Sequence, residues 1–146
     1  MHNDEGGTLF VNQSTITGNV DQGGNGGGLD NSNASIATVT DSTISFNTTT
    51  GDGGGIDNPG RGNELTVNNS VITGNSAGTT GGGISASFSS VTITDSTISA
   101  NVVNGTTALG GGIYANFGSV TVQNSTITGN AANGTQLGEG GLQLRQ

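Results

Sequence analysis

The chain contains no cysteine and no lysine, and among its 146 residues only Arg61 and Arg145 carry a fixed positive charge. Without cysteine, no disulfide framework holds the fold together. Without a basic patch, the chain cannot neutralise phosphates or an anionic membrane surface, which argues against nucleic acid and anionic lipid as partners. The formal net charge of -8 favours solubility or the attraction of cations.

Apolar residues are also scarce. They make up 29% of the chain, with four Phe, one Tyr and no Trp, and no apolar run approaches the roughly 20 residues that span a bilayer. We therefore expect no membrane insertion. Low hydrophobicity combined with abundant Gly, Ser, Thr and Asn is typical of disordered segments. What favours a folded protein instead is the regular position of the few aliphatic residues.

One short phrase recurs five times: a Thr-Ile-Thr-like triplet, one further residue, and Asn. The triplets are 15–17, 43–45, 71–73, 97–99 and 126–128, and the asparagines are Asn19, Asn47, Asn75, Asn101 and Asn130. The asparagines follow one another at steps of 28, 28, 26 and 29 residues, which is typical of a stacked solenoid. The pattern predicts an all-β, single-stranded parallel β-helix of about five coils, with 26–29 residues per coil, as one domain over residues 1–146.

Three elements are predicted in each coil. The first is an alternating strand, at 9–11, 37–39, 65–67, 91–93 and 120–122. The second is the triplet, whose central residues Ile16, Ile44, Ile72, Ile98 and Ile127 point inward. The third begins with glycines, at 26–29, 53–56, 81–84, 110–113 and 139–142. The segments between each Asn and the next glycines, such as 102–109, are interpreted as variable loops.

Stacking at the strand spacing of about 4.8 Å places equivalent residues directly above one another. The five recurring asparagines then form a column whose amides hydrogen-bond from coil to coil and satisfy polar groups at a turn. We interpret this column as a structural ladder. A second column of Ser14, Ser42, Ser70, Ser96 and Ser125 runs beside it.

The motifs Gly82-Gly83-Ile84 and Ile72-Thr73-Gly74-Asn75, the latter followed by Ser76-Ala77, resemble a known repeat family. They are similar to the right-handed parallel β-helices of the pectin-lyase-like superfamily, and more closely to the polymorphic outer-membrane and extracellular-repeat proteins. The resemblance extends from about Thr8 to Leu142. It implies a right-handed coil and an extracellular or cell-surface location, while many unrelated activities occur on this scaffold.

Members of that superfamily include surface adhesins, passenger domains, and polysaccharide lyases and hydrolases. The resemblance implies that an enzyme would use clustered Asp residues with Ca²⁺, or a catalytic Arg or Lys. Here lysine is absent, Arg61 lies in a Pro-Gly-Arg-Gly loop, and Arg145 lies at the C-terminus. No set of three carboxylates converges on neighbouring coils, so we expect no enzymatic activity.

The best pair of carboxylates is Asp30 and Asp57, which occupy equivalent positions on adjacent coils and are followed by Asn31 and Asn58. Stacked carboxylates with flanking amides offer oxygen ligands suited to Ca²⁺. The alternative interpretation is that each residue ends its glycine-led strand in an Asx turn. No other cofactor is expected.

Two surface patterns indicate binding functions, and each has a plain alternative. The outward Thr-x-Thr rows at 15–17, 43–45, 71–73, 97–99 and 126–128 resemble ice-binding surfaces, although exposed strand positions favour Thr in any case. Phe88 and Phe117 occupy equivalent places on adjacent coils. They form either a stacking platform for sugar or an aromatic stack that covers the core.

The ends of the solenoid carry no recognisable cap. The chain opens on the core strand 9–11, closes on a glycine-led strand, and contains five copies of each element with no partial set left over. We predict that copies associate head to tail, through an interface that comprises Leu9, Phe10, Val11, Leu142, Leu144 and Arg145. Phe10→Lys is expected to block this association. A segment of a longer surface protein is the alternative interpretation.

The function that we expect is therefore structural and non-enzymatic: a filament subunit that pairs with itself, or a rod in a surface assembly. An adhesin-like passenger or glycan-binding module is the second expectation. An ice-binding protein is the third, and a polysaccharide-active enzyme is the last.

Overall fold

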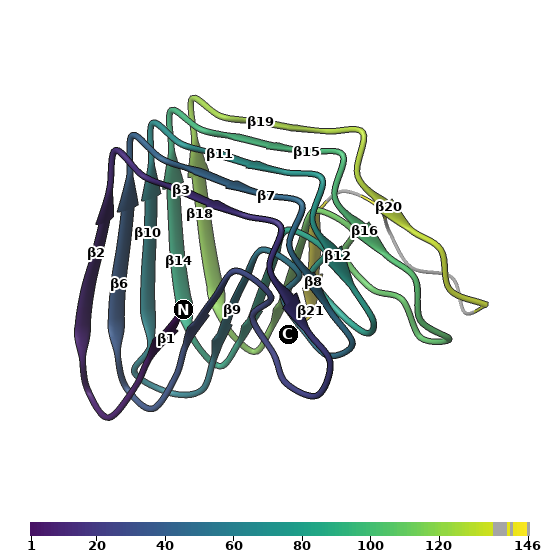
Figure 1. The fold of residues 1–146 in the computed structure, drawn as a ribbon, viewed down its shortest axis with the longest axis horizontal. Coiled ribbons are helices and arrows are strands. Elements are labelled where there is room, and N and C mark those ends of the chain that lie inside the picture. Colours follow the sequence, from purple (N-terminus) through teal and green to yellow (C-terminus); the bar gives the residue numbers. More distant parts are fainter. Residues whose placement is uncertain (136–139, 141, 146) are drawn as a thin grey trace.

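The computed structural model describes residues 1–135, 140 and 142–145, and in this part of the chain it contains 21 strands and no helix. The strands form four parallel sheets, which stack into a solenoid of about five turns with about 28 residues per coil (Figure 1). The predicted all-β parallel solenoid is confirmed. We name the sheets A to D, in the order in which one coil passes through them.

Sheet A has six strands and sheet B has five. Sheet A comprises β1 (His2–Asn3), β5 (Leu29–Asn31), β9 (Ile56–Pro59), β13 (Ile84–Ser87), β17 (Ile113–Asn116) and β21 (Leu142–Arg145). Sheet B comprises β2 (Thr8–Asn12), β6 (Ile36–Thr40), β10 (Glu64–Asn68), β14 (Ser90–Thr94) and β18 (Ser119–Gln123). The first strand of the chain, β1, and the last, β21, therefore both belong to sheet A.

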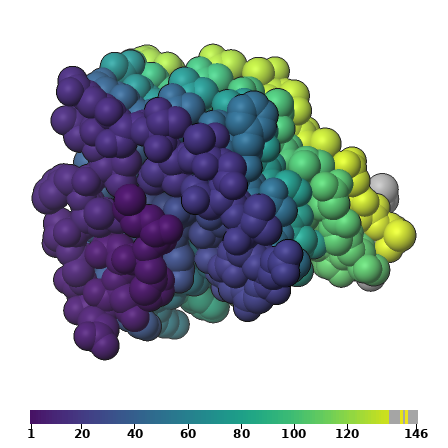
Figure 2. Space-filling view, in the orientation of Figure 1, coloured from purple at the N-terminus to yellow at the C-terminus, as the bar shows by residue number. Residues whose placement is uncertain are grey.

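Sheets C and D have five strands each. Sheet C comprises β3 (Thr15–Thr17), β7 (Thr43–Ser45), β11 (Val71–Thr73), β15 (Thr97–Ser99) and β19 (Thr126–Thr128). Sheet D comprises β4 (Val20–Asp21), β8 (Thr48–Thr49), β12 (Ser76–Ala77), β16 (Val102–Val103) and β20 (Ala131–Ala132). Figure 2 shows the coils as successive bands, from purple at the N-terminal end to yellow at the other.

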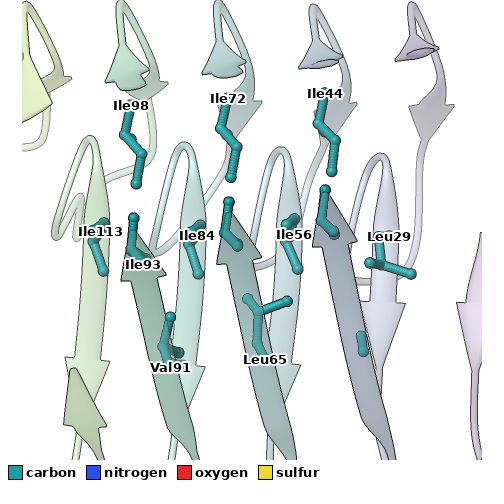
Figure 3. Packing of buried hydrophobic residues seen from close by; sticks show 14 of the residues in the cluster. Leu29, Ile44, Ile56, Leu65, Ile72, Ile84, Val91, Ile93, Ile98 and Ile113 are labelled. Atoms are coloured by element: carbon teal, nitrogen blue, oxygen red, sulfur yellow. The ribbon is translucent and has the colours of Figure 1, made fainter. Parts of the chain in front are cut away.

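The register places equivalent residues of the repeat opposite one another. Ile72 pairs with Ile44 on one side and with Ile98 on the other, and Leu65 pairs with Ala37 and Val91. The inward residues therefore form continuous aliphatic columns inside the coil (Figure 3). The largest fully buried side chains are Leu29, Ile44, Ile56, Leu65, Ile72, Ile84, Ile93, Ile98, Ile113, Val39, Val67 and Val91. One narrow core suffices because each coil contributes only a few inward side chains.

At the glycine runs, the backbones of neighbouring coils approach one another closely. A Cβ atom on Gly54 would lie 2.5 Å from the carbonyl oxygen of Gly82 and 2.6 Å from the carbonyl carbon of Ser76. The preceding glycine, Gly53, has a φ of +65° and turns the chain into sheet A. Glycine is thus required by close approach at one position and by backbone conformation at the other.

Two sequence predictions about the coil are wrong. The segments between each Asn and the glycines were expected to be loops, yet each begins with a two-residue strand of sheet D, such as Val102–Val103. The expected five copies of each element become six in sheet A, because His2–Asn3 pairs with β5 through Asp30 and Asn31. The chain thus opens on a sheet A strand, before the core strand at 9–11.

A second, smaller apolar cluster lies between sheet D and the loop that follows β16. It consists of Ala77, Val103 and Ala108, with Ala132 packed against it. In the described part of the chain, there is no helix of the length and apolarity needed to cross a membrane.

Candidate functional site

The predicted asparagine ladder runs through the described coils. Each internal Asn accepts two hydrogen bonds from the Asn of the preceding coil: Asn75 Oδ1 accepts them from the backbone N–H of Asn47 and from Asn47 Nδ2, both at 3.0 Å. Its own Nδ2 donates to Ile44 O at 3.0 Å and to Asn101 Oδ1 at 3.0 Å. Asn47, Asn75 and Asn101 are completely buried. Four hydrogen bonds per side chain satisfy the buried turn between sheets C and D.

The ladder has a direction, because every hydrogen bond between two of its asparagines is donated to the Asn of the following coil. It begins with Asn19, which donates to Asn47 Oδ1 from its backbone N–H at 3.0 Å and from Nδ2 at 2.8 Å. It ends with Asn130, whose Oδ1 accepts from the backbone N–H and the Nδ2 of Asn101. Among the hydrogen bonds between described residues, none is accepted by Asn19 Oδ1 and none is donated by the Asn130 backbone N–H. One end thus presents acceptors and the other presents donors.

The serine column has the same direction. The backbone N–H of Ser42 donates to Ser70 Oγ at 3.1 Å, and the backbone N–H of Ser96 donates to Ser125 Oγ at 3.0 Å. Within the described residues, Ser14 Oγ accepts no hydrogen bond and the backbone N–H of Ser125 donates none. Two parallel columns therefore leave complementary groups at opposite ends of the molecule.

Each end also exposes part of the aliphatic core. At the C-terminal end Val120, Val122, Ile127 and Leu142 are half-buried, whereas their internal equivalents Val91, Ile93, Ile98 and Ile113 are buried. At the N-terminal end Leu9 is half-buried, while Val11 and Ile16 are nearly covered. The C-terminal end is therefore an apolar surface bordered by polar ladders and by the open edges of parallel strands, whereas the N-terminal end leaves part of Leu9 uncovered.

The structure separates the residues of the predicted end-to-end interface. Leu9 and Val11 point into the core at the N-terminal end, but the side chain of Phe10 lies on the outer face of sheet B and is 73% exposed. Phe10→Lys consequently alters the side of the rod and does not probe its end. Leu142 packs against the core at the opposite end. The side chains of Leu144 and Arg145 lie outside the described part of the structure, although the backbone of both belongs to β21.

The chain was compared with family models, curated proteins and solved structures. No family model matches the chain, no curated protein matches it, and no solved structure matches it.

A pocket of about 390 Å³ opens at the N-terminal end, beside β1. Its walls are formed by the first residues of the chain, by β4 with the residue before it, and by the glycine run that leads into β5. The lining residues are Met1, His2, Asn19, Val20, Asp21, Gly24, Asn25, Gly26, Gly27 and Asp30. In the internal coils, the equivalent surface is covered by the preceding coil, as the burial of Asn47 and Thr49 shows.

Asp30 and Asp57 are brought together as predicted, since they pair across β5 and β9. Asp57 is only 1% exposed, and neither of its carboxylate oxygens has a hydrogen-bond partner among the described residues. Asp30 Oδ1 is likewise buried and unpartnered, whereas Asp30 Oδ2 lies 2.9 Å from His2 Nδ1. No three His, Cys, Asp or Glu side chains in the described ranges are arranged to hold a metal ion.

Burial governs the protonation of this pair. It raises the pKa of Asp57 to about 7, and the negative charges of Asp52 and Asp30 act in the same direction. Burial also raises the pKa of Asp30, while the neighbouring His2 lowers it. A proton on Asp57 would give that side chain a donor and would remove a buried charge.

The two outward rows of sheet C are in register, as the Thr-x-Thr pattern predicts. The first row includes the exposed Val71 among threonines. In the second row, neighbouring hydroxyl groups are hydrogen-bonded to each other. Ser45 Oγ donates to Thr17 Oγ1 at 3.1 Å, and Thr73 Oγ1 and Ser99 Oγ are hydrogen-bonded at 3.0 Å. These hydroxyl groups are engaged within the protein.

Phe88 and Phe117 stack as their spacing predicts, with ring centroids 5.2 Å apart and an interplanar angle of 14°. They are 44% and 59% exposed, respectively, at the corner between sheets A and B. The guanidinium of Arg61 lies 5.7 Å from the centroid of the Phe88 ring. The stack is therefore a surface feature and not a cover over the core.

Sequence reasoning missed a second asparagine column. In sheet A, Asn3 Nδ2 donates to Asn31 Oδ1 at 2.7 Å, and Asn31 Nδ2 donates to Asn58 Oδ1 at 2.6 Å. The spacings of 28 and 27 residues matched the repeat and provided the signal. Through Asn3, this column ties β1 to the first complete coil.

Proposed function

We propose that this chain is a non-enzymatic structural β-solenoid whose copies stack end to end into filaments or into the rod of a surface assembly. The observation that carries the proposal is the polarity of the Asn and Ser ladders. Asn130 and Ser125 present donors at one end, and Asn19 Oδ1 and Ser14 Oγ present acceptors at the other. A copy placed in register satisfies both sets, as each coil does for its neighbour.

Burial of the apolar ends supports the same association. Complete burial of one aliphatic side chain contributes roughly 1.5–3 kcal/mol. Val120, Val122, Ile127 and Leu142 are half-buried in the single copy, so each gains part of that amount when covered. The surfaces at the two ends differ, so the contact is head to tail and does not close on itself.

The likeness of the motifs to polymorphic outer-membrane and extracellular-repeat proteins supports an extracellular or cell-surface location. We accordingly place the chain among right-handed parallel β-helices of the pectin-lyase-like type as part of this proposal. The same likeness supports a scaffold role for the solenoid, with copies of itself as the partner.

Electron microscopy of the pure, tag-free chain at neutral pH tests the proposal. We expect thin fibres with an axial repeat of about 24 Å, which is five coils at the strand spacing of about 4.8 Å. Val122→Lys places a charge on the exposed part of the core at the C-terminal end and should abolish the fibres. Thr121→Lys carries the same charge on the outer face of β18 and should not. Discrete short rods from the unaltered protein would refute the proposal.

A glycan-binding module is the second candidate, and the exposed stack of Phe88 and Phe117 favours it. Sugar rings pack against exposed aromatic faces, and the adjacent Arg61 supplies hydrogen-bond donors. Retention of the protein on a glycan array, lost in Phe117→Ala and kept in Phe46→Ala, would establish this function. Phe46 is a matched control because it is similarly exposed, at 68% against 59% for Phe117, but lies away from the stack.

A further inference from the structure

The number of strands in each sheet sets a condition on head-to-tail stacking. Within the described part of the chain, sheets B, C and D contain five strands each, whereas sheet A contains six. If β2, β3 and β4 of an incoming copy pair directly with β18, β19 and β20 of the copy before it, the first three sheets continue without a gap. In sheet A, however, β21 of the preceding copy and β1 of the incoming copy then require the same position, at the edge of β5 of the incoming copy.

If both β1 and β21 stayed in sheet A, the two copies would be separated in sheets B, C and D by the width of one strand, about 4.8 Å. That gap would leave the ends of the Asn and Ser ladders unmatched and the apolar ends open to water. One of the two strands must therefore leave sheet A when the copies join.

We propose that β1 is a temporary cap, which β21 of the preceding copy displaces from the edge of β5 when a filament elongates. This inference rests on the proposed end-to-end stacking and names the segment that controls it. The occupant of the edge is Leu142–Arg145 of a second copy of this chain.

The two strands differ in how much each contributes to the fold. β1 pairs through two residues, and Met1 before it is 58% exposed. β21 pairs through four residues, and its Leu142 packs against the aliphatic core. Release of β21 would uncover Ile113, whereas release of β1 removes no member of the core cluster. Displacement of β1 is thus the less costly exchange.

The column of Leu142 also fits the vacated edge. Leu142 continues the inward column that begins with Leu29 and runs through Ile56, Ile84 and Ile113. In the exchanged arrangement, Leu142 of the preceding copy lies over Leu29 of the next and replaces the exposed Met1. The pocket of about 390 Å³ is lined by Met1 and His2 and by the glycines before β5, along the edge that β1 would vacate.

The contacts of β1 make the exchange slow. The N-terminal ammonium group donates to Gly28 O at 2.9 Å, His2 Nδ1 lies 2.9 Å from Asp30 Oδ2, and Asn3 Nδ2 donates to Asn31 Oδ1 at 2.7 Å. These contacts satisfy the edge of the free copy and must break before elongation. β1 thereby limits the rate at which copies join.

A reversible covalent lock tests the inference. The double variant His2→Cys/Asp30→Cys joins two residues that face each other on adjacent parallel strands, at a Cα separation of about 5 Å, which a disulfide spans. The oxidised variant should elongate at least tenfold more slowly than the same protein after reduction with dithiothreitol. Because both states carry the same substitutions, the comparison isolates the release of β1.

A second variant changes the rate in the opposite direction. Asn3→Ala removes the Asn3 side-chain hydrogen bonds to Asn31, Gly7 and Ile36, and should shorten the lag of fibre formation severalfold. Asn12→Ala is the control, because Asn12 is an exposed side chain on the neighbouring strand β2. Circular dichroism before assembly checks that every variant remains folded.

The outcomes separate this inference from the proposed function. Equal elongation of the oxidised and reduced forms, with normal fibres from the unaltered protein, would overturn the displacement of β1 and leave end-to-end stacking intact. Absence of fibres from the unaltered protein would overturn both.

Discussion

The side-chain oxygen of Asn75 accepts two hydrogen bonds from one residue of the preceding coil, Asn47, whose backbone N–H and Nδ2 both lie 3.0 Å away. This double contact fixes the turn between sheets C and D and links it to the next coil. The same geometry recurs from Asn19 to Asn130, so the ladder ties the described coils together along one line.

Asn75→Ala should destabilise the protein strongly. The substitution removes the acceptor of the Asn47 backbone N–H, one of the two acceptors of Asn47 Nδ2, and the Asn75 side-chain donor to the carbonyl of Ile44. A polar group orphaned in such a buried site costs about 1–3 kcal/mol. Asn19→Ala is the matched control, because Asn19 is exposed and accepts no hydrogen bond from the described residues. Urea denaturation of both variants should show a clearly lower free energy of unfolding for Asn75→Ala. Equal losses would mean that the ladder does not stabilise the coils.

The repeat predicted the ladder and the core because both depend on equivalent positions in successive coils. The Ile and Asn columns follow from the register alone, as the pairing of Ile72 with Ile44 and Ile98 confirms. Sheet D could not be predicted, since its two-residue strands share no composition: Val20–Asp21, Thr48–Thr49, Ser76–Ala77, Val102–Val103 and Ala131–Ala132. Their position follows from the turn at the preceding Asn and from packing against neighbouring coils.

The role of His2–Asn3 and the burial of Asp57 also escaped prediction, for a different reason. β1 carries neither a glycine run nor an aliphatic residue, and only its pairing with Asp30 and Asn31 identifies it as a strand. Asp57 follows Ile56, and the sequence was interpreted either as placing a calcium ligand there or as ending the strand there in an Asx turn. In β9, however, three consecutive residues are buried, so both faces of sheet A are covered. Such burial depends on tertiary packing and leaves no local signal.

Gly54→Ala should be more destabilising than substitution of a glycine in open space. Its Cβ would approach backbone atoms of Gly82 and Ser76 within 2.6 Å, and overpacking of this kind costs about 1–3 kcal/mol. Gly18→Ala meets no atom within 4 Å but has a φ of +67°, so we expect a loss of about 1 kcal/mol from backbone strain. Gly23→Ala meets neither constraint and should be neutral. Thermal melts of the three variants should follow that order; a neutral Gly54→Ala would show that adjacent coils separate easily.

The stability of the protein should fall as the pH rises from about 4 to about 7. Folding raises the pKa of Asp57 from 3.8 to about 7, so across this range the folded state keeps a proton that the unfolded state has lost. The stabilisation is fully present below the unfolded pKa and is lost as the pH passes through the folded pKa. On the linkage relation, the loss is on the order of 4 kcal/mol. The negative charges of Asp52 and Asp30 also raise the pKa of Asp57, and His2 lowers the pKa of Asp30.

Asp57→Asn tests the origin of this pH dependence. The amide is neutral at every pH, so the variant should melt at a higher temperature than the unaltered protein at pH 8 and should lose most of the slope between pH 4 and 7. Thermal melts at each pH in a chelating buffer provide the measurement, and a second series with Ca²⁺ follows. If Ca²⁺ raises the melting temperature of the unaltered protein at pH 8 but not that of Asp57→Asn, the carboxylates bind a cation instead of a proton.

Asn130→Asp should weaken end-to-end association while keeping the outline of the side chain. Asp retains an oxygen that accepts from Asn101, but it loses the Nδ2 donor that would face Asn19 Oδ1 of the next copy. The loss of one hydrogen bond and the added repulsion between oxygens correspond to roughly a tenfold rise in the critical concentration for fibres. Sedimentation of fibres at a series of protein concentrations measures it.

Asn133→Asp is the control for this substitution, because it introduces the same charge at an exposed position three residues further along the chain. Asn130→Asp also removes the hydrogen bond from Nδ2 to Ile98 O, so its melting temperature must be measured below the critical concentration. A change in critical concentration that Asn133→Asp shares would reflect net charge and would argue against contact between the ladder ends. A rise in critical concentration that only Asn130→Asp shows, and that its loss of melting temperature does not explain, places Asn130 at the junction between copies.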